Sequence, residues 1–308
     1  LSTSRTTLKK SLCFTPCREH LAVEAGSFYE ATSAAHTYIE YGVAEAQHKT
    51  LFNWINMSRI AQIFRYPVKG LSPEPMPKVE LKPGGCIPMD RAFALAHGST
   101  EFDPIKPKFL PKTKFLMLAQ NERLASLRSR YLENSQELVI ERDGQQVARG
   151  RLDQPVGRQM IEQFFAGYLG DEVRGSPKLL RAPRHTFSDM PRHCLSLINI
   201  SSLRELERVV KAPIDPLRFR ANLYFDTGTP WKEFDWCDKE FKIGCATVKG
   251  LVRTQRCAAT NVNLETARRD VNIPLQLNQA FGHVDMGIYV SVIKGGTIRQ
   301  GDTLTLPK

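Results

Sequence analysis

Cys257 is the residue of this sequence with the clearest chemical potential. It lies in the stretch RTQRCAATN, residues 253–261, and follows two arginines, Arg253 and Arg256. Nearby cations favour the thiolate over the thiol, and the thiolate is the form that attacks electrophiles and binds soft metals. The stretch therefore predicts either a reactive thiol or a metal ligand.

Four roles are open to such a thiol: a buried core residue, a zinc ligand, a catalytic nucleophile, or a ligand to a softer metal. Zinc is disfavoured because the chain holds no C-x-x-C or H-x-x-x-H pair, and Cys13 and Cys17 form only a C-x₃-C. A nucleophile needs a base, but no sequence signature pairs the thiol with a particular histidine. The candidate bases are His97, His185, His193 and His283.

Further cations suit a phosphorylated ligand. Arg91 in MDRAF and Arg220 in RFRAN lie near predicted strand ends, and the chain carries 43 Lys plus Arg against 32 Asp plus Glu, a net charge of +11. Each arginine alone is better explained as a solvated surface charge than as a ligand contact, so the interpretation depends on their convergence in the fold. An anionic ligand, a nucleic acid or a membrane surface would each account for the excess charge. No RNA-recognition motif or aromatic-basic repeat favours nucleic acid.

The composition is that of an ordinary globular protein, with 24% charged and 42% hydrophobic residues. Seven cysteines, an odd number spread over a long chain, indicate a reduced compartment. No run approaches about 18 apolar residues, so the sequence predicts no transmembrane helix and a cytoplasmic protein. Residues 1–57 differ from the rest and are interpreted as a poorly ordered extension, or as the result of a mis-assigned start before Met57. The Ser/Thr-rich, acid-free first 18 residues leave organelle targeting as an alternative.

Short strands dominate the predicted elements of the first half. RIAQIFRY (59–66), VELKPGG (79–85), DRAFALAH (90–97) and KFLMLAQ (114–120) are predicted strands, and ERLASLRSRYLE (122–133) is a predicted helix. The stretch 137–152 predicts a hairpin turning at Asp143-Gly144, because a type I′ turn needs positive φ at both central residues. A helix is predicted over 155–169, beginning at Pro155 and ending before Gly170.

The second half opens with the strand CLSLINI (194–200), which leads straight into the helix SSLRELERVV (201–210). Ser202 and Glu205 have capping-box spacing, and the helix N-terminus offers N–H groups to an anion, although Ser201 and Ser202 would also serve as simple caps. Strands within 218–226, 240–257 and 285–306 with Gly turns indicate a barrel rather than βαβ repeats.

The expected fold class is therefore predominantly β with some helices (α+β). The expected organisation is an extension over 1–57, one β-barrel domain over 58–180 and a second over 181–308, with the boundary falling around 175–190.

Five stretches of the sequence together carry a resemblance to a known family. They are FRYPVKG (64–70), PGGCIPMDRAFALA (83–96), RFRANL (218–223), RTQRCAATNVNLET (253–266) and GGTIRQGD (295–302). In this order they resemble the MOSC domain proteins with an N-terminal MOSC β-barrel domain, relatives of the mitochondrial amidoxime-reducing component and its bacterial counterparts. The resemblance covers residues 59–308.

The resemblance implies a molybdenum cofactor, Mo-molybdopterin, with Cys257 as the protein ligand to molybdenum and as the catalytic residue. The implied pterin and phosphate contacts are Lys69, Arg91, Ser201, Ser202, Arg220, Asn222 and Arg256. The chain departs from the family at Ala221, where proline is frequent, and at Gly70, where serine would add a hydroxyl contact.

The implied activity is reduction of N-hydroxylated compounds, a detoxification chemistry, with electrons from a separate ferredoxin-, flavodoxin- or cytochrome b5-type donor. The chain ends without the four cysteines of a C-terminal iron-sulfur domain. The alternative is a cofactor or sulfur carrier without turnover, and a basic nucleic-acid-binding module is a third hypothesis. Pyridoxal phosphate binding is a further family-level association.

Overall fold

The protein is described by a computed structural model over residues 58–305. The predicted extension over 1–57 lies outside the described residues. The described part is predominantly β and holds three α-helices, so the predicted fold class is confirmed. The helices are α2 (Pro155–Leu169), α3 (Ile200–Val210) and α4 (Ile273–Phe281).

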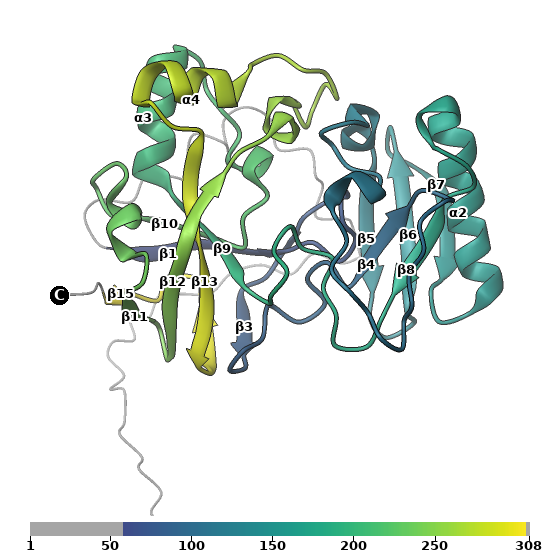
Figure 1. The fold of residues 1–308 in the computed structure, drawn as a ribbon, viewed down its shortest axis with the longest axis horizontal. Coiled ribbons are helices and arrows are strands. Elements are labelled where there is room, and N and C mark those ends of the chain that lie inside the picture. Colours follow the sequence, from purple (N-terminus) through teal and green to yellow (C-terminus); the bar gives the residue numbers. More distant parts are fainter. Residues whose placement is uncertain (1–57, 306–308) are drawn as a thin grey trace, which may run out of the picture. The chain divides into compact units, whose positions relative to one another are not determined.

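One mixed eight-stranded sheet forms the larger part of the fold, in the order β15-β11-β12-β13-β9-β10-β1-β2. Its two long strands, β12 and β13, run side by side in the left half of Figure 1. The strands of this sheet are β1 (Arg59–Arg65), β2 (Glu74–Pro75), β9 (Leu195–Asn199), β10 (Leu223–Asp226), β11 (Glu240–Ile243), β12 (Ala246–Gln255), β13 (Asp285–Lys294) and β15 (Leu304–Thr305).

The first strands of the chain pair with the last ones. β1 is antiparallel to β10, and β3 (Lys78–Leu81) pairs with β14 (Gly296–Arg299). Side chains of both regions share one buried apolar cluster, which includes Ile63, Leu81 and Ile298. The N-terminal strands are therefore part of the architecture that the C-terminal half builds.

A parallel crossover interrupts the antiparallel pattern: the predicted strand over 194–200 and the predicted helix over 201–210 form a βαβ unit with the strand that follows. β9 and β10 are parallel neighbours joined through α3. The N-cap of α3 is Asn199, whose side chain accepts a hydrogen bond from the Ser201 N–H at 3.2 Å. The predicted Ser202–Glu205 capping box is wrong, because the N-cap is Asn199, three residues before Ser202.

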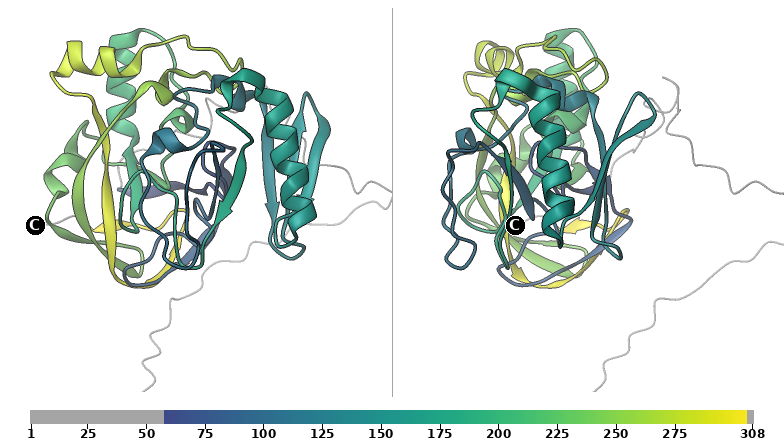
Figure 2. Two further views of the ribbon diagram at one scale, coloured as in Figure 1. Left: turned by 45° about the vertical axis from the view of Figure 1, so that its right-hand side comes forward. Right: turned by 90° about the vertical axis from the view of Figure 1, so that its right-hand side faces the viewer.

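The remaining strands form two smaller sheets. β4 (Phe93–Ala96) pairs with β8 (Lys178–Arg181), and β5 (Arg128–Leu132), β6 (Glu137–Arg142) and β7 (Gln145–Arg151) form a meander. The predicted hairpin is confirmed, with φ of 52° at Asp143 and 75° at Gly144. The helix α2 has the predicted bounds and lies along the meander (Figure 2).

Two predictions in the first half are wrong. The apolar run 114–120 forms no strand: Phe115 makes a single bridge to Ala96, and the run then turns, with Gln120 N–H bonding Met117 O. The predicted helix over 122–133 is instead a short 3₁₀ turn, Glu122–Ser126, followed by β5. Ser129 and Tyr131 of β5 are buried while the residues on either side of them are exposed, and this period of two is that of a strand.

Among the helices of residues 58–305, none is long and apolar enough to cross a membrane.

Candidate functional site

A cavity of about 570 Å³ opens beside the end of β12. Segments from both halves of the chain line it: the turn at Asp90 and Arg91, the stretch 117–119, the connection between β8 and β9, and the end of β12. Among the residues of that connection, Ser188, Asp189 and Met190 face the cavity. The stretch expected to be a domain boundary thus supplies part of the site.

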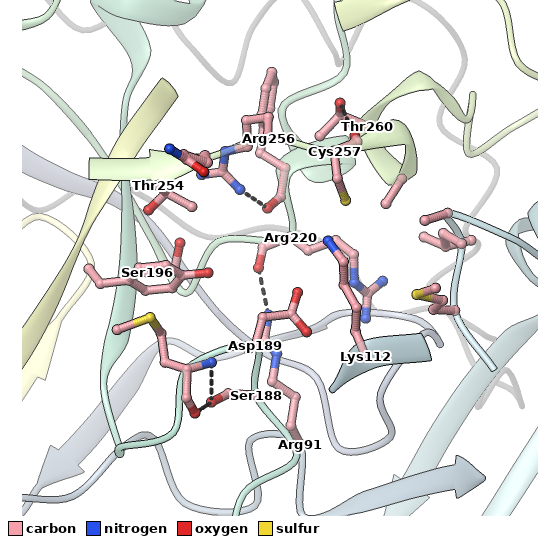
Figure 3. Close-up of a pocket in the computed structure, with 18 of the residues that line it drawn as sticks. Arg91, Lys112, Ser188, Asp189, Ser196, Arg220, Thr254, Arg256, Cys257 and Thr260 are labelled. Carbon is pink, nitrogen blue, oxygen red and sulfur yellow. Dashed lines mark hydrogen bonds between the residues drawn. The ribbon is translucent and has the colours of Figure 1, made fainter. Parts of the chain in front are cut away.

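Cys257 is half-buried and lines this cavity. It is the N-cap of the 3₁₀ turn Ala258–Asn261, and its carbonyl accepts bonds from the Thr260 N–H at 3.0 Å and the Thr260 hydroxyl at 2.9 Å. In Figure 3 its sulfur points into the space beside Arg220 and Lys112. The turn therefore presents the thiol to whatever occupies the cavity.

Arg256 holds the backbone around this turn. Its Nε and Nη2 donate to Met286 O at 2.9 and 2.5 Å, and its Nη1 donates to Phe219 O at 2.9 Å. Burial lowers the pKa of the guanidinium, and the carbonyl oxygens compensate for the lost water. The resemblance made Arg256 a cofactor contact, whereas here its donors tie β12 to β13 and to the segment before Arg220.

Arg91 and Arg220 form the cationic floor of the cavity. Both have positive φ, 50° and 53°, a conformation that a non-glycine residue rarely adopts. Their guanidinium carbons lie 4.7 and 4.3 Å from the centre of the Tyr66 ring. Arg91 Nη1 donates to Asp90 and Nη2 to Arg220 O at 2.8 Å. Backbone strain of this kind is retained where the surroundings fix it, and it is concentrated at functional sites.

Arg220 has no carboxylate bonded to its guanidinium among the hydrogen bonds and ion pairs of residues 58–305, and its Nη2 is buried without a hydrogen-bond partner there. Burial, with Arg91 also repelling the charge, lowers its pKa to about 10. A buried, unpaired cation is costly unless an anion joins it.

Lys69 adds a third buried cation. Its Nζ donates to Phe187 O at 2.9 Å and to Asp189 at 2.5 Å. Burial lowers its pKa, while Asp189 acts in the opposite direction. Lys69 is thus partly paired, and Asp189 belongs to the same cavity-lining connection as Ser188.

Two hydroxyl groups in the cavity wall also lack partners. Ser196 Oγ, in β9, and Thr254 Oγ1, in β12, are buried and have no hydrogen bond within residues 58–305. An unsatisfied buried polar atom costs about 1–3 kcal/mol. Sequence reasoning missed both residues, although each is a lone polar side chain in a buried strand position, and this pattern is a usable signal.

Asn222 lines the cavity, but its side chain is committed to the fold. Its Oδ1 accepts from the Ser196 N–H at 3.0 Å and its Nδ2 donates to Phe64 O at 3.2 Å. The amide thus joins β9 to β1, and it positions the floor without offering a free donor to a ligand.

Ser201 and Ser202, the other implied phosphate contacts, do not line the cavity. Ser201 Oγ donates to Asp226, and Ser202 Oγ donates to Glu233 at 2.8 Å. Both residues are buried in α3. The structure therefore separates them from Lys69, Arg91, Arg220, Asn222, Arg256 and Cys257, which it brings together.

Two family models match the chain: the MOSC N-terminal beta barrel domain over residues 57–174 and the MOSC domain over residues 183–305. The protein therefore belongs to the MOSC domain proteins that carry an N-terminal MOSC β-barrel domain. MOSC domains are associated with binding of the molybdenum cofactor and with sulfurase-like proteins.

Similar solved structures include YiiM from Geobacillus stearothermophilus, with 21% identity, a TM-score of 0.30, and coverage of 37% of this chain and 54% of that chain. They also include the YUAD protein from Bacillus subtilis, with 13% identity, a TM-score of 0.37, and coverage of 80% of this chain and 94% of that chain. The chain thus spans about half the length of YiiM. Comparison with curated protein sequences finds no match.

The cavity fits a phosphorylated, polar cofactor with a soft metal. The unpartnered atoms Arg220 Nη2, Ser196 Oγ and Thr254 Oγ1 would gain hydrogen bonds from it, and the Cys257 thiolate suits a metal that sulfur already binds. Within the described residues, no cluster of three or more His, Cys, Asp or Glu side chains is arranged to hold a metal ion.

Proposed function

We propose that this protein is a molybdenum-cofactor-dependent oxidoreductase that reduces N-hydroxylated compounds with electrons from a separate donor protein. The observation that carries the proposal is the buried Nη2 of Arg220, which has no hydrogen-bond partner among residues 58–305 and belongs to a residue that lines the same cavity as Cys257. The cavity thus offers a cation that suits a phosphate and a thiol that suits a metal. The similarity of the sequence motifs to those of the amidoxime-reducing relatives supports the choice of reaction.

The cofactor, when bound, supplies the two-electron redox chemistry that removes the oxygen from nitrogen. Cys257 Sγ would be the protein ligand to molybdenum. Arg91 and Arg220, together with Lys69, would neutralise the phosphate, and Ser196 and Thr254 would offer their unpartnered hydroxyl groups to the cofactor.

The rest of the turn keeps the ligand in place. Arg256 fixes the end of β12 through the Met286 and Phe219 carbonyls, so the thiol has a defined direction. A preorganised ligand loses little conformational entropy when the cofactor binds.

Turnover with an amidoxime and a reduced viologen dye tests this proposal. The wild-type protein, made in a host that synthesises the cofactor, is expected to form the amidine, and Cys257→Ser to form none. Cys245→Ser, which changes an exposed thiol away from the cavity, is the matched control and should keep full activity.

Protein that retains molybdenum and pterin but turns over no N-hydroxylated substrate with any donor would contradict the proposal. That result would support the carrier function instead.

A further inference from the structure

We propose that Arg269 is a positioning residue that fixes the wall opposite Cys257 and thereby limits the size of molecule that reaches the thiol sulfur. Arg269 follows the Cys257 turn in sequence and bridges it to a segment of the N-terminal half. The proposal concerns access to the sulfur, and it rests on the proposed function only where it refers to substrates.

The bridge consists of four hydrogen bonds from one guanidinium. Nη1 donates to Ala258 O, next to Cys257, at 2.8 Å. Nη2 donates to Ala119 O at 3.0 Å, Leu118 O at 3.3 Å and Glu122 Oε2 at 3.0 Å. One planar group thus links the backbone beside the thiol to the segment 118–122.

That segment is a wall of the cavity. Met117, Leu118 and Ala119 line it from the N-terminal half, and Ala259 lines it from the Cys257 turn. Leu118 also shares a buried apolar cluster with Val262, which follows the turn. The two sides therefore meet at one edge of the cavity, and Arg269 spans that edge on the outside.

The contacts indicate that Arg269 fixes the distance between the Cys257 turn and the segment 118–122, and that it contributes little to the global stability of the fold. Ala258 and Arg269 are exposed, so water can replace the guanidinium at the carbonyl when Arg269 is removed. The ion pair with Glu122 joins side chains that are 33% and 40% exposed, and surface pairs of this kind contribute little to stability. What is lost is the fixed distance between the thiol turn and the wall.

Lysine cannot reproduce this arrangement. An ammonium has three donors on a flexible stem, whereas the guanidinium presents a planar fork that can bond carbonyls of two segments at once. Arg269→Lys should therefore preserve the charge and the ion pair with Glu122, but it should not bond the carbonyls of both segments at once.

Size-graded alkylation of Cys257 tests the proposal without any cofactor. The full chain is made in a host that lacks the cofactor and is treated with iodoacetamide or with a bulky fluorescein maleimide. Mass spectrometry of the Cys257 peptide gives both rates. The alkylation rate with the maleimide is divided by the rate with iodoacetamide. Both reagents react with the thiolate, so a change in the thiolate fraction cancels in this ratio, which reports only the access of large molecules to the sulfur.

Arg269→Ala is expected to raise this ratio about tenfold, the change that a barrier lower by 1.36 kcal/mol gives. Arg269→Lys should lie between Arg269→Ala and wild type. The matched control is Arg268→Ala, which removes the same charge from the adjacent exposed position and should leave the ratio within about twofold of wild type.

An Arg269→Ala ratio equal to that of Arg268→Ala, in protein with wild-type near-UV circular dichroism, would overturn the proposal. If Arg269→Ala fails to fold, Arg269→Lys decides, and a wild-type ratio for the lysine variant overturns it. The assay needs no molybdenum, so its outcome is independent of whether the proposed reduction occurs. Where turnover is found, Arg269→Ala should also raise the relative kcat/KM for bulky amidoximes.

Discussion

At the scale of single residues, Arg220 differs from an ordinary surface arginine. It lies at positive φ, stacks on Tyr66, and has a buried donor without a partner among the described residues. The low-dielectric setting that lowers its pKa to about 10 also strengthens its attraction for an anion. We therefore expect the Arg220 guanidinium to bind an anion.

Arg220→Gln should therefore weaken anion binding. A hydrogen bond to a charged group contributes about 1.5–3 kcal/mol, so the affinity for inorganic phosphate should fall about tenfold or more. A thermal-shift titration with phosphate measures this. Arg253→Gln is the control, because Arg253 also lines the cavity but is exposed and stacks on Phe234 at 4.4 Å. Equal phosphate affinities for the two variants would count against a phosphate-binding floor.

At the scale of elements, α2 and β7 approach each other closely at Gly157. A Cβ added at Gly157 would lie 2.2 Å from Arg151 O and 2.4 Å from Arg151 N, both rigid backbone atoms of β7. A Cβ at Gly167, in the same helix, would meet nothing within 4 Å. The close approach therefore depends on one glycine and not on the other.

Gly157→Ala should lower the free energy of unfolding by about 1–3 kcal/mol, because the helix must move away from the strand. Gly167→Ala should raise it by about 0.5–1 kcal/mol, because alanine favours the helix. Urea unfolding of both variants checks the pair. Similar effects of the two substitutions would show that the helix does not pack on β7 through Gly157.

The accuracy of the sequence predictions also varies by element. The helix over 155–169 could be predicted because proline and glycine mark its ends, and the 143–144 turn because its backbone demands are strict. The run 114–120 could not, because its apolar residues signal burial and not conformation. The cap of α3 was misplaced because Asn199, Ser201 and Ser202 are all competent caps, and only the path of β9 decides among them.

The candidate site was predictable to a similar degree. Cys257, Arg91 and Arg220 were singled out by type and setting, and the fold brings them to one cavity. Ser188 and Thr254 were not, because their approach depends on how the β8–β9 connection and β12 cross in space. Arg256 and Asn222 were placed near the ligand, but which of their atoms bond the backbone was not readable from the sequence.

At the scale of the whole molecule, stability should depend on the buried carboxyl of Glu233. Burial raises its pKa from 4.5 to about 7, and bonds from Asn199 and Ser202 only partly offset this. The folded state then holds a proton that the unfolded state has lost between those two pH values. The contribution of Glu233 to stability is therefore greatest below about pH 4.5 and declines as the pH rises to about 7.

Glu233→Gln removes this dependence. We compare the free energy of unfolding of the variant with that of the wild type. The difference, variant minus wild type, should rise by on the order of 2–3 kcal/mol between pH 4.5 and about pH 7. Denaturant unfolding of both proteins across the range measures the difference. A difference that stays constant with pH would exclude a titrating Glu233 in the folded state.

The site as a whole is assembled from both halves of the chain, with the Cys257 thiol as the proposed metal ligand. Molybdenum and pterin analysis of protein purified from a host that makes the cofactor tests this assignment most directly. Wild type and Cys245→Ser should carry molybdenum close to one equivalent per chain, while Cys257→Ala should carry only background metal. A wild-type protein that never acquires molybdenum, or a Cys257→Ala variant that retains as much as wild type, would contradict the account.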